Sequence, residues 1–263
     1  MSDIILVCPH YCIDIITNKL QNSYDNCLYC IDAISASESC NTSPFIKRFV
    51  NITYENKSNI QQKLSDISTN IIGFSYNSLN NSHIKSHILL SNNKHVTLLY
   101  DGNIFNCDYL KEKLKRLNYR FDNDNNLDVI INYIEHEYNS LLKNINNKDK
   151  DDYVIQNNYS ELFIEAINNT LFNIEGTFSI ILMCSLCSNK IYTFTKYNKL
   201  YTTTNNAIPI ISNNKQAILN ENETVITLQS NLIYVIDIFN YKYSNNTQLM
   251  INYIHPKEIY GSF

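Results

Sequence analysis

The stretch LLYDGNIFNCDYLKEKLKRL, residues 98–117, is the part of the sequence that most clearly indicates a fold. Its apolar start at 98–100 is typical of a buried strand, and the pair Asp101-Gly102 that follows accepts the positive φ of a tight turn. Leucines then recur at helical spacing, which predicts an amphipathic helix over 108–117. The stretch is therefore expected to present a backbone turn at the edge of a sheet.

Glycine is scarce in this chain, and this makes each glycine informative. Only four occur among 263 residues, namely Gly73, Gly102, Gly176 and Gly261. A sequence this poor in glycine is expected to keep one where a side chain does not fit or where the backbone needs a conformation that other residues disfavour. Gly102 is therefore predicted to be a geometric requirement of the turn.

Outside this stretch, the predicted strands fall into two groups that flank a central group of helices. Strands are predicted before it at 4–7, 24–33 and 70–75, and after it at 177–184, 190–196, 200–203, 208–212, 224–228 and 232–238. Helices are predicted at 60–67, 128–142 and 159–172, with a solvated loop over 144–158. Such segregated blocks favour an α+β fold with packed antiparallel sheets over an alternating doubly wound fold.

The composition excludes several classes of function. Hydrophobic residues make up 44% and charged residues 17% of the chain, the formal net charge is −4 and the sequence pI is about 5.9. No basic field is present that would hold nucleic acid or an anionic membrane surface, so neither is expected as a partner. The N-terminus lacks a basic segment followed by a long apolar run. We therefore expect no signal peptide, no membrane span and a cytoplasmic protein.

Eight cysteines raise the question of a metal site. Two C-x-x-C pairs, at 27–30 and 184–187, lie far apart in apolar, strand-like contexts, so small buried thiols in a reducing compartment are favoured over zinc. The H-x-x-x-H spacing at 83–87 falls in an asparagine-rich loop and favours surface histidines. No metal and no other cofactor is expected.

Several short segments, in the same order, resemble one protein family. MSDI at 1–4 stands where the family has Met-Cys-Gly-Ile, and GFSYNSL at 73–79 stands where it has Gly-His-Thr-Arg-Trp-Ala-Thr. YDGNIFN at 100–106 stands for His-Asn-Gly-Ile-Ile-Glu-Asn, and FDNDNNLDVI at 121–130 resembles Phe-x-Ser-x-Thr-Asp-Thr-Glu-Val-Ile. Over nearly its whole length the chain thus resembles the class II (N-terminal-nucleophile) glutamine amidotransferases. The resemblance is strongest to the glutaminase half of glutamine-fructose-6-phosphate aminotransferase.

The resemblance implies a fold and a division of the chain. The fold would be a four-layer αββα sandwich of the N-terminal-nucleophile hydrolase type, in agreement with the strand blocks that flank central helices. The amidotransferase-like domain would span 1–240. The tail 241–263, with PKEIY at 256–260, resembles the linker that leads into a sugar-phosphate isomerase domain, and that domain itself is expected to be absent. The implied partners are glutamine or a related small molecule and a separate isomerase-type chain.

The resemblance also implies catalytic positions for three residues. Ser2 occupies the position of the N-terminal cysteine, which attacks the glutamine amide while its own α-amine serves as general base. Gly102 occupies the position of the glycine whose backbone amide lines the oxyanion hole, and Asp101 replaces the asparagine whose side chain is the second donor. A carboxylate there places an acceptor where negative charge develops during the reaction.

The substrate-binding positions are altered in the same way. Tyr76 replaces the arginine that forks onto the carboxylate of glutamine, and Asn126 replaces the aspartate that holds its α-ammonium. Asp128, two residues further on, is a candidate to compensate. Because four roles are altered, the sequence favours a catalytically degenerate homologue, that is, a pseudoenzyme. The enzyme that it resembles belongs to amino-sugar biosynthesis. The alternative is an active, altered amidohydrolase that uses Ser2 as nucleophile on glutamine or another amide.

Overall fold

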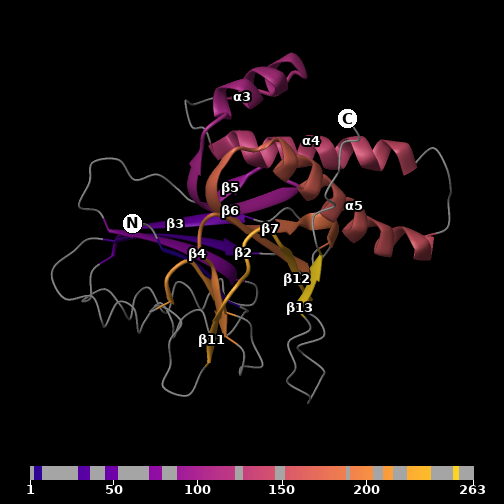
Figure 1. Ribbon diagram of the computed structural model, residues 1–263. Coiled ribbons are helices and arrows are strands. Elements are labelled where there is room, and N and C mark those ends of the chain that lie inside the picture. The colour runs from indigo at the N-terminus through magenta and orange to yellow at the C-terminus, as the bar shows by residue number, and fades with distance from the viewer. Residues whose placement is uncertain are drawn as a thin grey trace.

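Two stacked sheets and three described α-helices form the structure, a computed structural model (Figure 1). It describes residues 3–7, 29–35, 45–52, 71–78, 88–121, 127–145, 152–187, 190–203, 210–215, 224–237 and 251–254. The strands are β1 (Asp3–Val7), β2 (Tyr29–Ser35), β3 (Phe45–Ile52), β4 (Ile71–Ser78), β5 (Ile88–Leu90), β6 (Val96–Ile104), β7 (Gly176–Cys184), β8 (Lys190–Lys196), β9 (Tyr201–Thr203), β10 (Ile210–Ser212), β11 (Val225–Thr227), β12 (Ile233–Asp237) and β13 (Ile251–Ile254). The helices are α3 (Cys107–Arg116), α4 (Leu127–Ile145), α5 (Asp152–Asn173) and the short 3₁₀ helix η2 (Ser185–Cys187).

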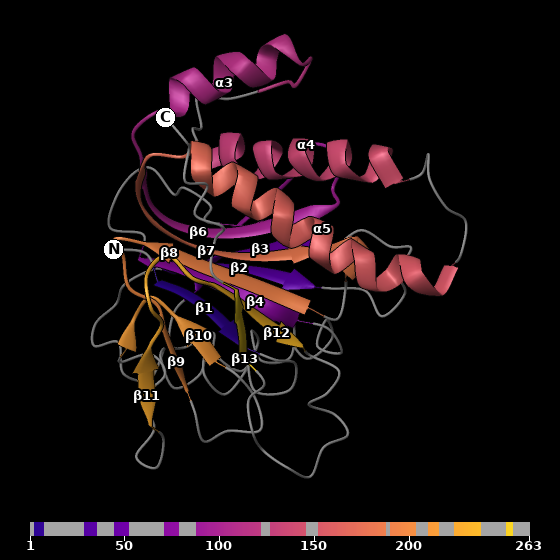
Figure 2. The ribbon, with the colours of Figure 1, turned by 45° about the vertical axis from the view of Figure 1, so that its right-hand side comes forward.

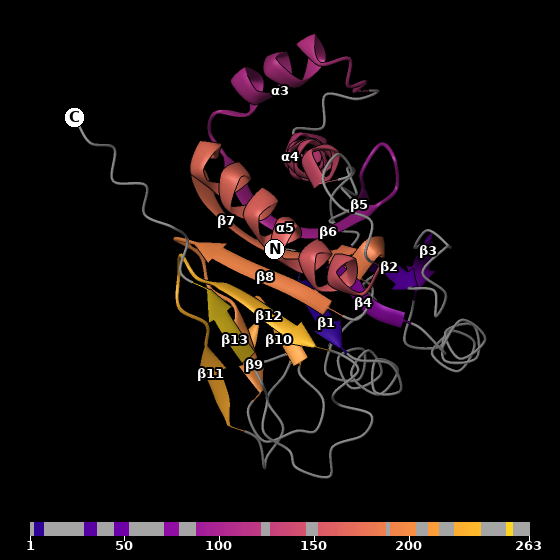
Figure 3. The same ribbon diagram turned by 90° about the vertical axis from the view of Figure 1, so that its right-hand side faces the viewer.

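The described strand pairings are all antiparallel. One sheet has seven strands in the order β11-β9-β10-β1-β4-β2-β3, and the other has six in the order β13-β12-β8-β7-β6-β5. β1 of the first sheet contacts β6 of the second, so the two sheets face each other. Helices α4 and α5 cover the opposite face of the six-stranded sheet (Figures 2 and 3). This confirms the α+β class with packed antiparallel sheets, while the second helical layer stays a prediction.

Strand β6 supplies side chains to two cores. Leu98 and Tyr100 belong to the core beneath the helices, whereas Leu99 belongs to the core between the sheets, together with Ile181 and Ile211. Successive residues of a strand point to opposite faces, so a strand that is covered on both sides is apolar on both. Its partner β7 is accordingly buried along nearly its whole length, which explains the continuous apolar run in its sequence.

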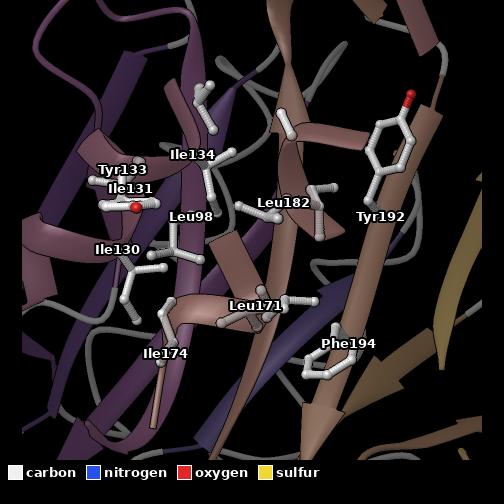
Figure 4. Packing of buried hydrophobic residues seen from close by; sticks show 14 of the residues in the cluster. Leu98, Ile130, Ile131, Tyr133, Ile134, Leu171, Ile174, Leu182, Tyr192 and Phe194 are labelled. Atoms are coloured by element: carbon white, nitrogen blue, oxygen red, sulfur yellow. The ribbon is translucent and has the colours of Figure 1, made fainter. Parts of the chain in front are cut away.

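The core beneath the helices is closed by apolar side chains of α4 that recur at helical spacing. Ile130 and Ile134 are fully buried and share this core with Leu98 of β6 and Leu182 of β7 (Figure 4). Burying one such side chain stabilises the fold by about 1.5–3 kcal/mol.

Among the helices in the described part of the chain, none combines the length and apolarity needed to cross a membrane.

Gly102 lies inside strand β6 and not in a tight turn. The strand continues through it to Ile104, and Gly102 pairs with Phe178 of β7. The prediction of a turn at Asp101-Gly102 is therefore wrong, because pairing with β7 carries the strand past the glycine. The predicted need for glycine is confirmed: its φ is +134°, and an added Cβ would lie 2.2 Å from the carbonyl oxygen of Thr177 and 2.5 Å from Cα of Phe178.

Most predicted elements lie within five residues of the observed ones, but several differ. The loop predicted over 144–158 is wrong in its second half, because α5 begins at Asp152, where acidic residues favour a helix N-terminus. Strands β3, β5 and β13 have no counterpart among the predicted strands. β13 lies in the predicted tail and pairs with β12, and the domain division stays a prediction. The helix predicted at 60–67 and the histidines at 83–87 lie outside the described residues.

Candidate functional site

Asp101 occupies a half-buried position between the two sheets and is held there by two amide side chains. Its Oδ2 accepts a hydrogen bond from Nδ2 of Asn198 at 3.2 Å and another from Nδ2 of Asn213 at 3.1 Å. Asn198 lies in the connection between β8 and β9, and Asn213 directly follows β10. The carboxylate therefore ties the six-stranded sheet to the seven-stranded one. It is oriented as an acceptor, with both donors supplied by the protein itself.

A row of small polar side chains extends from Asp101 across the six-stranded sheet. Asp101 lies opposite Ser179 of β7, and Ser179 lies opposite Thr195 of β8. Oγ of Ser179 and Oγ1 of Thr195 are 3.2 Å apart in a buried hydrogen bond. Cross-strand partners share one face of a sheet, so these hydroxyl groups face the seven-stranded sheet, as Asp101 does. Polar groups thus replace the apolar inter-sheet core at this end.

The first residues of the chain lie beside this end of the sheets. Ile5 of β1 pairs with Ser212 of β10, and the two strands are antiparallel. The residues that precede Ile5 therefore run alongside those that follow Ser212, which brings the start of β1 next to Asn213, the partner of Asp101. Ser2 itself lies outside the described residues, directly before β1.

The other candidate residues are Tyr76, Asp128 and Asn126. Tyr76 lies on β4 opposite Asp3, so its backbone is beside the start of β1. Asp128 is half-buried in the first turn of α4, the helix that covers the face of β6 opposite to that of Asp101. Asn126 lies outside the described residues. The structure thus brings Tyr76, Asp101 and Gly102 to the elements around β1, and the substrate-binding roles stay predictions.

Tyr100 stays neutral beside Asp101. Burial raises the pKa of its hydroxyl well above the usual value, and the nearby Cys107 and Asp101 raise this pKa further. Its ring is 6.4 Å from that of Phe178 in a stacked arrangement. Because Tyr100 remains protonated at neutral pH, its hydroxyl adds no negative charge beside Asp101.

Asn198 and Asn213 are the site residues that the sequence analysis missed. Both belong to a chain in which asparagine is abundant, so residue type alone gives no signal. Each stands within two residues of the end of a predicted strand, where side chains that gather at a sheet edge are expected. Only the packing of β8 and β10 shows that both amides reach the same carboxylate.

Cys30 and Cys184, one from each C-x-x-C pair, lie on different sheets. Cys184 and Cys187 are buried at the end of β7 and in η2, as expected for small buried side chains. Cys30 lies on β2 of the seven-stranded sheet, and Cys27 lies outside the described residues. Within the described ranges, no group of three or more His, Cys, Asp or Glu residues is arranged to hold a metal ion.

The fold is similar to that of solved glutamine amidotransferase structures. Glutamine phosphoribosylpyrophosphate amidotransferase from B. subtilis, complexed with ADP and GMP, matches with a TM-score of 0.60 and 11% identity over 90% of this chain and 47% of that chain. A structure described as the allosteric regulatory enzyme of purine biosynthesis matches with a TM-score of 0.59 and 10% identity, again over 90% and 47%. A glutamine aminotransferase class-II domain protein from Silicibacter pomeroyi matches with a TM-score of 0.50 and 11% identity over 97% and 99%. No family model and no curated protein sequence matches the chain.

These neighbours define the class of fold and no more. The chain has the mixed helix and antiparallel-sheet fold of N-terminal-nucleophile hydrolases, as found in class II glutamine amidotransferases. It spans about half the length of the first two proteins and nearly the full length of the third. At identities of 10–11% the likeness concerns the fold alone.

Proposed function

We propose that this chain is a glutamine amidotransferase-like protein, resembling the glutaminase domain of glutamine-fructose-6-phosphate aminotransferase, in which hydrolysis of glutamine is absent or very slow. The observation that carries the proposal is that the carboxylate of Asp101 is held as a hydrogen-bond acceptor. Its carboxylate accepts hydrogen bonds from Asn198 and Asn213 next to the start of β1. A site for amide hydrolysis needs donors at that place, because an oxyanion forms there in the transition state.

The electrostatics of this arrangement oppose the reaction. Loss of one oxyanion donor lowers the rate by about 100- to 1,000-fold, and an ionised carboxylate beside a developing oxyanion adds repulsion to that loss. The two amides that could supply replacement donors already donate to Asp101. Asp101 thus takes the place of one donor, and its carboxylate occupies the amide groups of Asn198 and Asn213 as well.

The substrate-binding positions support the same conclusion. Tyr76, beside the start of β1, has no positive charge with which to hold the carboxylate of glutamine. Ser2 provides a hydroxyl in place of a thiol, and a hydroxyl is the weaker nucleophile near neutral pH. Glutamine or a related small molecule therefore remains the proposed ligand, bound weakly.

One observation favours an active enzyme of altered specificity as the second candidate. A carboxylate that is fixed by two amides is a preorganised anion, and such a group binds a substrate ammonium well. In this alternative, Ser2 acts as N-terminal nucleophile on glutamine or on another amide that carries a positive charge near the scissile bond.

The deciding experiment is an ammonia-release assay on purified protein from which Met1 has been removed, with glutamine and with a panel of cationic amides. A class II amidotransferase of known activity serves as the positive control. We expect turnover well below roughly one per second on every amide, the low end for competent enzymes. Turnover of glutamine at or above that rate would overturn the proposal, and turnover of a cationic amide alone would establish the alternative.

PKEIY at 256–260 resembles the linker that leads into a sugar-phosphate isomerase domain. On this basis we also propose that this protein binds a separate isomerase-type chain. Size-exclusion chromatography of this protein mixed with a sugar-phosphate isomerase domain tests it. Co-elution supports the proposal, and separate elution at micromolar concentrations contradicts it.

A further inference from the structure

A cluster of polar groups surrounds the C-x-x-C pair at the end of β7. We call it the dithiol cluster and define it by Cys184, Cys187, Tyr138, Tyr192 and Ser160. Cys184 and Tyr192 both lie near enough to Cys187 to affect its pKa. Oη of Tyr138 lies 3.9 Å from Sγ of Cys187. Thiols that only filled space would need no such partners.

The short backbone path between the two cysteines is compatible with a disulfide. Cys184 is the last residue of β7, and Cys187 ends the 3₁₀ helix η2 that follows at once. A 3₁₀ helix rises about 2.0 Å per residue, so the three steps from Cys184 to Cys187 span about 6 Å. A disulfide spans Cα separations of about 4.4–6.8 Å, so the pair can close with little backbone movement.

A chain of hydrogen bonds connects the dithiol cluster to a lysine. Nζ of Lys190 donates to Oγ of Ser160 at 3.0 Å, and this hydroxyl is 2.9 Å from Oη of Tyr192. Tyr192 in turn interacts with Cys187 and lowers the pKa of its thiol. The ring of Tyr192 is held by Phe163, whose centroid lies 4.9 Å away in an edge-to-face contact. A cation thus reaches the thiol through two oriented hydroxyl groups.

The two thiols are unequal in acidity. The hydrogen bond from Cys184 lowers the pKa of Cys187 and outweighs burial, and Tyr192, Tyr138 and Lys190 lower this pKa further. Burial raises the pKa of Cys184 well above its usual value. Cys187 is therefore the thiol that ionises first, and a thiolate is the reactive form in exchange with disulfides.

We propose that Cys184 and Cys187 form a redox-active dithiol that closes to an intrachain disulfide by exchange with a low-molecular-weight disulfide such as oxidised glutathione. The Cys187 thiolate attacks one sulfur of that disulfide, whose S–S bond breaks, and one glutathione thiolate leaves and is protonated by water. Cys184 loses its proton to solvent and attacks Sγ of Cys187, and the second glutathione thiolate leaves. The protein thus loses two hydrogen atoms, and one oxidised glutathione is reduced to two thiols.

Access to the pair depends on local opening of η2. Cys187 is 5% exposed, whereas its neighbour Leu186 is 39% exposed, so the turn lies at the surface. A 3₁₀ helix of three residues has few hydrogen bonds to break, and short surface elements open at low free-energy cost. Cys107 offers the contrast within this chain, because it is buried on α3 and its pKa is raised to about 11, chiefly by burial.

The sequence makes the test direct, since cleavage after lysine yields a peptide, 151–190, that contains Cys184 and Cys187 and no other cysteine. The full chain is incubated with oxidised glutathione at pH 7.5, remaining thiols are blocked with N-ethylmaleimide in denaturant, and the peptide is weighed without reduction. We expect a peptide lighter by two hydrogen atoms with no maleimide adduct, and two adducts after prior reduction. Two adducts on this peptide after oxidation of folded protein would overturn the proposal.

Variants assign the roles of the two thiols. In Cys184→Ser we expect a glutathione adduct trapped on Cys187, and in Cys187→Ser several-fold less adduct on Cys184. Tyr192→Phe keeps the packed ring and removes the hydroxyl, so we expect disulfide formation to slow at pH 7.5 and to recover at higher pH. Tyr234→Phe on β12 is the matched control and should match the parent. Equal adducts in the two serine variants, or an unchanged rate in Tyr192→Phe, would contradict the assignment of Cys187 as the attacking thiol.

Discussion

Asp101 and Asn213 are hydrogen-bonded across the two sheets, with Nδ2 of Asn213 3.1 Å from Oδ2 of Asp101. The contact joins residues 112 positions apart in the sequence. The sequence resemblance assigns Asp101 to the position of an oxyanion donor. We therefore expect this contact to affect the chemistry of the site as well as its stability.

Removing the amide of Asn213 should weaken the link between the sheets. A hydrogen bond to a half-buried charged group contributes about 1–2 kcal/mol, so we expect Asn213→Ala to lower the free energy of unfolding by that amount. A double-mutant cycle with Asp101→Ala, measured by urea denaturation, isolates the interaction. Additive effects of the two substitutions would show that the contact contributes nothing.

Catalytic rescue should follow a fixed order if the backbone of the site has kept its geometry. Ser2→Cys together with Asp101→Asn restores a thiol and an oxyanion donor, and we expect weak glutaminase activity that saturates only at high glutamine. Adding Tyr76→Arg should then lower KM clearly, because the arginine anchors the substrate carboxylate. Ammonia release against glutamine concentration is the measurement. A folded triple variant without activity would indicate that the backbone itself no longer fits the reaction.

Gly102→Ala should strongly destabilise the protein. The new Cβ would lie 2.2 Å from the carbonyl oxygen of Thr177, and the φ of +134° is unfavourable for any L side chain. We expect a loss of about 3 kcal/mol or more in the free energy of unfolding, measured by urea denaturation. Asn103→Ala, at the exposed neighbouring position of the same strand, is the control and should change stability by less than about 0.5 kcal/mol.

Glu135 should be the most sensitive carboxylate of α4. It is fully buried and accepts hydrogen bonds from the hydroxyl of Ser91 and from the backbone and side-chain amides of Asn93, the latter two at 3.2 and 3.1 Å. Glu135→Ala leaves these donors without an acceptor, so we expect a loss of about 3 kcal/mol in thermal or urea unfolding. Glu112→Ala removes an exposed ion pair with Lys115 and should leave stability unchanged within error.

His136 should make stability depend on pH below neutrality. Burial lowers its pKa in the folded protein, so the unfolded chain binds the proton more readily. The stabilisation is complete above the unfolded pKa near 6.5 and is lost as pH falls toward the folded value. We expect the midpoint of urea unfolding between about pH 5 and 7 to fall less steeply in His136→Gln than in the parent. Identical slopes in the two proteins would contradict the role assigned to burial.

The sequence by itself determined the α+β class, the order of most strands and helices, and the need for glycine at position 102. These features depend on periodicities of two and 3.6 residues and on backbone limits, which act over short distances along the chain. Even so, β3, β5 and β13 escaped prediction, and all three are edge strands, which pair with a single neighbour in their sheet. Tertiary structure alone decided that β6 runs past Gly102, because its hydrogen-bonding partner β7 lies more than 70 residues further on.

The same distinction holds for the candidate sites. The sequence resemblance singled out Asp101, but only packing brought Asn198 and Asn213, 97 and 112 residues away, to its carboxylate. The C-x-x-C spacing is visible in the sequence, whereas its connection through Tyr192 and Ser160 to Lys190 arises where β7, β8 and α5 meet. Hydrogen bonds between side chains from distant segments leave no periodic trace in a sequence, since they depend on where several elements end in space.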